Sequence, residues 1–162
     1  MVAHIGDFGL AKLLPFKPHQ NSSIGIRGTT GYAAPEYGVG NEMTKQGDVY
    51  SFGILLLEMI TGRRPTDPVF QEGLNLHGHV KTALPDRVME IIEPLILPTR
   101  KEAANGYEGR KLKRLEEAMI SLARIGLACS MESPGERMNM SNVLHELQRI
   151  NDILQNSESS SV

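Results

Sequence analysis

Hydrophobic residues are densest between positions 45 and 62, where the chain reads KQGDVYSFGILLLEMITG. From Val49 onward they fall on every side of a 3.6-residue helix, a pattern that is typical of a helix in a protein interior. The segment predicts a buried central helix about 25 Å long, with other helices packed around it. It is too short and too often interrupted for a membrane span, which needs about 20 apolar residues. Asp48 stands out because a carboxylate at the start of a buried helix needs hydrogen-bond donors or a cation.

The C-terminal third predicts two further helices, each with one apolar face. Apolar residues recur in steps of three and four over residues 112–129, and again from 140 to 154. Asn139 is placed to cap the last helix, and residues 133–136 (SPGE) have the form of a capping box with proline at the first helical position.

The remaining segments show weaker patterns. Short amphipathic helices are expected over residues 74–84 and 87–92, and one marginal strand over residues 2–5. A long loop is expected over residues 7–37, a polar linker over 98–110 and a disordered tail over 155–162. Together the patterns predict a mainly α fold of four to six helices in one unit, with a long N-terminal loop and almost no sheet.

Composition narrows the function classes. The 162 residues carry a formal net charge of -2, which gives no electrostatic reason to expect a nucleic-acid partner. A single cysteine, Cys129, excludes an internal disulfide framework and is most simply a small core residue in a reducing, intracellular setting. His77 and His79 do not share a helical face, so ordinary surface or interface histidines are favoured over a metal site. We expect neither a secretory leader nor a membrane segment in this chain.

Five short motifs carry the chemical signal. Asp7-Phe8-Gly9 opens the long loop, and Ala34-Pro35-Glu36 closes it directly after the sequence GTTGY. The central helix then begins with DVYSFG, and Arg137 precedes the last helix. Each motif alone is weak, because three-residue strings arise by chance. Their order and spacing together resemble the C-terminal part of a protein kinase domain, most closely that of plant leucine-rich-repeat receptor-like serine/threonine kinases, over about residues 2–154.

The resemblance implies roles for individual residues. Asp7 would hold the Mg²⁺ of ATP, Phe8 would pack beneath it and Gly9 would let the backbone turn. Thr29 would position the peptide near the catalytic base. Residues of the activation loop that could be phosphorylated are Ser22, Ser23 and Thr30, with simple solvation as the equal alternative for the two serines.

The resemblance also implies structural roles in the helical lobe. Glu36 would form a buried ion pair with Arg137, which joins the end of the loop to the last helices. Asp48 would accept hydrogen bonds from the backbone of the catalytic loop. These roles make residues 1–154 a partial kinase domain.

Other kinase motifs are absent from these 162 residues. The sequence contains no G-x-G-x-x-G loop, no V-A-I-K lysine and no H-R-D-x-x-x-x-N catalytic loop. The expectation is therefore a truncated C-lobe that is inactive alone, from a cytoplasmic part of a plasma-membrane receptor that uses ATP and Mg²⁺ on protein substrates or partner kinases. A non-catalytic binding module and a non-functional truncation are the alternatives.

Overall fold

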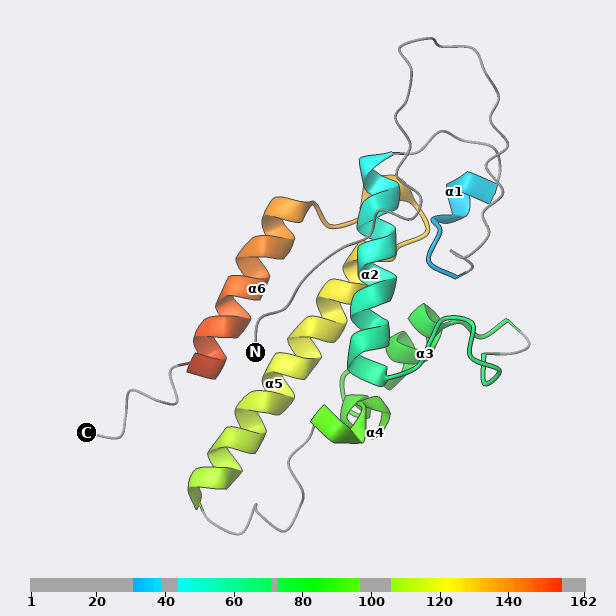
Figure 1. The fold of residues 1–162 in the computed structure, drawn as a ribbon. Helices are drawn as coiled ribbons and strands as arrows, with labels where there is room; N and C mark the ends of the chain where they lie inside the picture. The colour runs from blue at the N-terminus through cyan, green and yellow to red at the C-terminus, as the bar shows by residue number, and fades with distance from the viewer. Residues whose placement is uncertain (1–30, 39–43, 71–72, 97–105, 156–162) are drawn as a thin grey trace.

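The computed structural model describes residues 31–38, 44–70, 73–96 and 106–155 (Figure 1). The helices are α1 (Pro35–Gly38), α2 (Lys45–Thr61), α3 (Leu76–Ala83), α4 (Val88–Ile91), α5 (Gly106–Cys129) and α6 (Met140–Gln155). Two single 3₁₀ turns, η1 (Pro94–Ile96) and η2 (Pro134–Glu136), lie between them. No described residue lies in a β-strand, so the mainly helical fold that the sequence predicts is confirmed for this part of the chain.

Helix α2 is the centre of the arrangement, as predicted, and both of its ends are capped. The Thr44 hydroxyl accepts a hydrogen bond from the Gly47 amide (3.1 Å) at the start. Gly62 follows the last turn in the left-handed region (φ 65°), and its amide donates to the Glu58 carbonyl (2.8 Å). The predictions of this helix and of its end at Gly62 are therefore confirmed.

Helix α5 packs along α2 and separates it from α6 (Figure 1). The α2–α5 contact is close because two glycines meet there: a Cβ added at Gly53 would lie 2.8 Å from the Gly126 carbonyl oxygen, and one added at Gly126 would lie 2.5 Å from Leu57. Leu57 is completely buried at this contact. The core of the protein therefore lies between α2 and α5, where small residues let the two backbones approach.

One side of α2 is uncovered by the described elements. Leu55 and Met59 are 48% and 65% exposed, and Asp48, seven residues before Leu55 on the same side, is also exposed. The prediction of burial on every side, including the Asp48 carboxylate, is therefore wrong. Because α5 and α3 pack against other sides of the helix, no described element shields this one.

The short helix α3 is tied to the end of α5 by a polar contact. The Ser130 hydroxyl donates to the Gly126 carbonyl (2.7 Å), so it must accept from the His77 Nδ1–H that lies 2.7 Å away. Burial lowers the pKa of His77, with the nearby Lys81 charge acting in the same direction. The predicted helices over 74–84 and 87–92 are confirmed as α3 and α4, and Asn75 caps α3 through the Gly78 amide (2.7 Å).

Two local predictions fail near α5 and α6. Residues 106–110 belong to α5 instead of a polar linker, because the charged residues around Gly109 are good helix formers and outweigh the two glycines, Gly106 and Gly109. Ser133 makes no capping contact through its side chain, and the predicted capping box is only the 3₁₀ turn η2. By contrast Asn139 does cap α6, since its side-chain oxygen accepts from the Asn142 amide (2.9 Å).

The ends of two further predictions are wrong: residues 35–37 were expected in the loop but belong to α1, and Gln155 was expected in the tail but is the last residue of α6. Other expectations lie outside the described residues: the strand over 2–5, the loop over 7–30, the linker over 98–105 and the tail over 156–162. None of the described helices combines the length and apolar character needed to cross a bilayer.

Candidate functional site

Arg137 joins three parts of the chain that are distant in sequence. Its side chain is 1% exposed, and its Nη1 and Nη2 atoms donate to the two carboxylate oxygens of Glu36 at 2.7 Å each, across 101 positions. Nη1 also donates to the Gln46 carbonyl (2.9 Å), Nη2 to the Glu132 carbonyl (2.9 Å) and Nε to the Met131 carbonyl (2.8 Å). A guanidinium has five N–H groups, and each of them has an acceptor here.

The environment of this ion pair favours its charged form. The Glu36 side chain on α1 is 11% exposed, and its hydrogen bonds with Arg137 lower the pKa of the carboxyl group. The Tyr50 ring lies under the guanidinium, 5.1 Å from its centroid to the Arg137 Cζ atom, as in a cation–π contact. The pair is thus held from one face by an aromatic ring and from its edges by backbone carbonyls.

A second contact anchors the residues just before α1 to α2. The Tyr32 hydroxyl donates to Glu58 at 2.5 Å, and the Ser51 hydroxyl donates to the Tyr32 carbonyl at 2.9 Å. Burial and the hydrogen bond to the Glu58 carboxylate raise the pKa of Tyr32 to about 12. Sequence reasoning missed this contact, although one signal was available: Glu58 interrupts the most apolar run of the chain and so needs a polar partner.

The motifs at Ala34-Pro35-Glu36 and at Arg137 are therefore held in one network with the central helix. Over residues 1–147 the sequence matches the family described as protein tyrosine and serine/threonine kinase.

The chain belongs to the protein kinase family.

Plant receptor kinases are among its curated relatives. It is 42% identical to the receptor kinase-like protein Xa21 of Oryza sativa subsp. japonica over 154 residues, which are 93% of this chain and 15% of that protein. It is 45% identical to the probable LRR receptor-like serine/threonine-protein kinase At3g47570 of Arabidopsis thaliana over 152 residues, 91% of this chain and 14% of the relative. The LRR receptor-like serine/threonine-protein kinase EFR, also from Arabidopsis thaliana, is 40% identical over 153 residues, with coverage of 91% and 13%. The chain thus spans about one seventh of the length of these kinases.

The structure brings together only some of the residues that the kinase resemblance singled out. Glu36 and Arg137 form the ion pair described above, and Asp48 lies exposed in the first turn of α2. The others fall outside the described residues: Asp7, Phe8, Gly9, Ser22, Ser23, Thr29 and Thr30.

ATP and Mg²⁺ are the cofactors that the kinase family implies. Asp7, the residue assigned to Mg²⁺ by the resemblance, lies outside the described residues. Among the residues that are described, no three His, Cys, Asp or Glu side chains gather as a metal site would require. In the network at Glu36 and Arg137, all five N–H groups of the guanidinium already have protein acceptors.

Proposed function

We propose that this chain supplies the activation segment and the helical lobe of a receptor-like serine/threonine kinase domain. Such a domain transfers the γ-phosphoryl group of ATP, with Mg²⁺, to a hydroxyl group of a protein substrate or partner kinase. In this proposal Asp7 binds Mg²⁺, Phe8 and Gly9 support its loop, and Thr29 positions the acceptor peptide. Ser22, Ser23 and Thr30 are candidate sites of regulatory phosphorylation.

The observation that carries the proposal is the saturated Arg137 network. It fixes Glu36, the last residue of the Ala34-Pro35-Glu36 motif, to the helical core, while Tyr32 is fixed independently through Glu58. A peptide-binding loop needs such a rigid end, because a small misplacement of a positioning group lowers the rate of phosphoryl transfer strongly. The two anchors support a role for residues 31–36 as the fixed end of the activation segment.

The uncovered side of α2 supports the same assignment. Asp48, Leu55 and Met59 form an exposed strip with a carboxylate at one end and large apolar side chains at the other. Exposed strips of this kind mark surfaces that another element covers. We assign the strip to the catalytic loop and its neighbouring helix in the whole kinase domain, with Asp48 accepting backbone hydrogen bonds from that loop.

The 162-residue chain alone should not phosphorylate proteins, because a catalytic base and a phosphate-binding lysine are absent from its sequence. The test incubates the purified chain with labelled Mg²⁺-ATP and a generic basic protein substrate, beside an Asp7→Asn variant. We expect both samples to give only background label. Incorporation by the wild-type chain that Asp7→Asn abolishes would contradict the proposal. An in-frame H-R-D-x-x-x-x-N segment in the transcript upstream of the Met1 codon would support a longer, active parent kinase.

A non-catalytic binding module is the second candidate function, and the closed α2–α5 core favours it. A lobe that acts alone must unfold cooperatively and remain monomeric. Thermal unfolding followed by circular dichroism should then give one sharp transition. A chain that binds hydrophobic dyes and lacks a transition would rule out the module and leave a non-functional truncation.

A further inference from the structure

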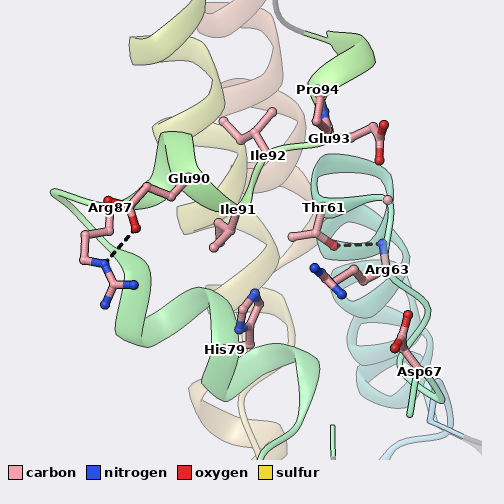
Figure 2. Close-up of a pocket in the computed structure, with 11 residues that line it drawn as sticks. Thr61, Arg63, Asp67, His79, Arg87, Glu90, Ile91, Ile92, Glu93 and Pro94 are labelled. Atoms are coloured by element: carbon pink, nitrogen blue, oxygen red, sulfur yellow. Dashed lines mark hydrogen bonds and ion pairs between the residues drawn. The ribbon is translucent and has the colours of Figure 1, made fainter. Parts of the chain in front are cut away.

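A cavity of about 520 Å³ opens between the C-terminal end of α2, α3 and α4 (Figure 2). Its volume lies within the range of ligand-binding pockets, roughly 300 to 1,000 Å³. Ile91, Ile92 and Thr61 form part of its wall, and charged side chains surround them. The cavity is separate from the Arg137 network, which lies near the other end of α2.

Two nitrogen-bearing groups at this cavity, the Arg63 guanidinium and the His79 ring at its Nε2 atom, have no hydrogen-bond partner among the described residues. The Nε2 atom of His79 is buried and lacks a partner, which is costly for a polar atom. Arg63, just after α2, is exposed, and no described side chain or carbonyl accepts from its guanidinium. In Figure 2 the guanidinium of Arg63 extends into the cavity toward the His79 ring. The space between them therefore lacks an acceptor.

The acidic residues around the cavity are engaged elsewhere or face away. Glu90 pairs with Arg87 at 3.0 Å on an exposed surface, and an Asp67 oxygen accepts from the Val69 amide at 3.0 Å. The Glu93 carboxylate lies against Gly62 and points away from the His79 ring in Figure 2. No carboxylate of the described residues thus fills the gap between Arg63 and His79.

We propose that this cavity binds an oxyanion, a carboxylate or a phosphate group, between the Arg63 guanidinium and the Nε2–H of His79. An anionic oxygen is an acceptor without a competing donor, and hydrogen bonds between a guanidinium and an anion are about twice as strong as neutral ones. A water molecule can bridge the same donors, but it does not neutralise the Arg63 charge. Free phosphate and the phosphorylated or acidic side chains of a protein partner share this chemistry. The proposal does not depend on the kinase activity.

The proposal predicts that the binding affinity depends on pH, because a bound oxyanion changes the protonation of His79. Burial lowers the pKa of His79, and the positive charges of Arg63 and Arg87 lower it further. A bound oxyanion offsets both charges, so the pKa of His79 is higher in the complex than in the free chain. Binding therefore takes up protons. The affinity is greatest below the free-state pKa and falls as the pH rises through the bound-state pKa.

The test follows the His79 ring nitrogens by NMR in the 162-residue chain labelled with ¹⁵N-histidine. The chain is titrated at constant ionic strength with inorganic phosphate, and with end-capped peptides Ala-Ala-Xaa-Ala-Ala in which Xaa is phosphoserine, glutamate or glutamine. We expect a saturable shift of the Nε2 resonance with the anionic ligands and no shift with the glutamine peptide. For the glutamate peptide, whose carboxylate stays ionised throughout the range in which histidine titrates, we also expect weaker binding at higher pH. Tighter binding of a peptide than of phosphate identifies a protein ligand, and the reverse identifies a free phosphate compound.

Matched variants decide whether the ligand binds in this cavity. Arg63→Gln should weaken binding roughly tenfold, equivalent to about 1.4 kcal/mol. Arg149→Gln on α6, which removes an exposed arginine paired with Glu146, should leave the affinity unchanged. Because Arg63 is exposed, its substitution does not endanger the fold. Absence of a saturable His79 shift, or a shift that Arg63→Gln leaves intact, would overturn the proposal.

Discussion

The two arginines near the ends of α2, Arg137 and Arg63, differ in burial and in how many of their N–H groups have acceptors. Near the N-terminal end, Arg137 is buried, and all five of its N–H groups have acceptors. Just beyond the C-terminal end, Arg63 is exposed beside a buried His79 nitrogen, and neither has an acceptor among the described residues. A saturated network leaves nothing to offer a ligand and contributes to holding the fold. An unsaturated one contributes little to the fold and is available for binding.

Removing the guanidinium of Arg137 should have the largest effect on stability. Arg137→Met leaves the Glu36 carboxylate, whose side chain is only 11% exposed, without its partner, which costs about 3 to 5 kcal/mol in the free energy of unfolding. Urea denaturation followed by circular dichroism measures this loss. Arg149→Met, which breaks the exposed pair with Glu146, is the control and should change stability by less than about 1 kcal/mol. Equal losses in the free energy of unfolding for the two substitutions would show that the saturated Arg137 network stabilises the fold no more than an exposed ion pair does.

Substitutions in the middle of α2 should also lower the stability strongly, because α2 and α5 pack closely there. Gly53→Ala places a methyl group 2.8 Å from backbone atoms of α5 and its end, so we expect a loss of about 1 to 3 kcal/mol. Gly109→Ala, where no atom lies within 4 Å of the new carbon, should stabilise α5 by about 0.5 to 1 kcal/mol. Thermal melts of both variants check the opposite signs. A neutral Gly53→Ala would mean that the two helices are not in close contact.

The burial of His77 between α3 and the end of α5 predicts a dependence of stability on pH, because burial lowers the pKa of the imidazole in the folded state. Because the folded-state pKa of His77 is lowered, its contribution is fully present above the unfolded-state value of 6.5 and is lost as the pH falls through the folded-state pKa. His79 acts in the same direction. Urea midpoints measured from pH 7.5 downward should therefore decrease below pH 6.5. His77→Asn should reduce the slope, and an unchanged slope would exclude His77 as its source.

The smallest effect on stability is expected at Arg63. Arg63→Gln removes an exposed group with no partner among the described residues, so the free energy of unfolding should change by less than about 0.5 kcal/mol. The same denaturation experiment measures it beside Arg137→Met. A loss comparable to that of Arg137→Met would show that the Arg63 guanidinium stabilises the fold, and it would weaken the ligand proposal.

Local sequence patterns predicted those features that depend on local physics. The limits of α2 followed from its apolar run and from Gly62, and the start of α6 followed from Asn139. Residues 106–110 were missed because glycine and a polar composition suggested a linker, whereas helix formers next to a long helix extend it. The exposure of Leu55 and Met59 depends on which elements pack beside α2, and periodicity within one helix does not contain that information.

The candidate sites likewise divide into features that the sequence could predict and features that depend on residues meeting in space. Pairing of Glu36 with Arg137 came from the kinase resemblance, since no local spacing relates residues 101 positions apart. The contact of Tyr32 with Glu58 escaped for that reason, because nothing in the motif before α1 named its partner. For His79 the sequence favoured an ordinary surface or interface histidine. Only the approach of Arg63 in space distinguishes it.

A double-mutant cycle between Glu36 and Arg137 tests most directly whether the kinase motif before α2 is locked to the helical lobe. The free energies of unfolding of the wild type, Glu36→Gln, Arg137→Met and the double variant are measured by urea denaturation. We predict a coupling energy of roughly 1 to 3 kcal/mol, because Glu36→Gln removes only the ion pair, whereas the bonds of Arg137 to three backbone carbonyls are lost in both backgrounds. Additive losses, with a coupling energy below about 0.3 kcal/mol, would contradict it.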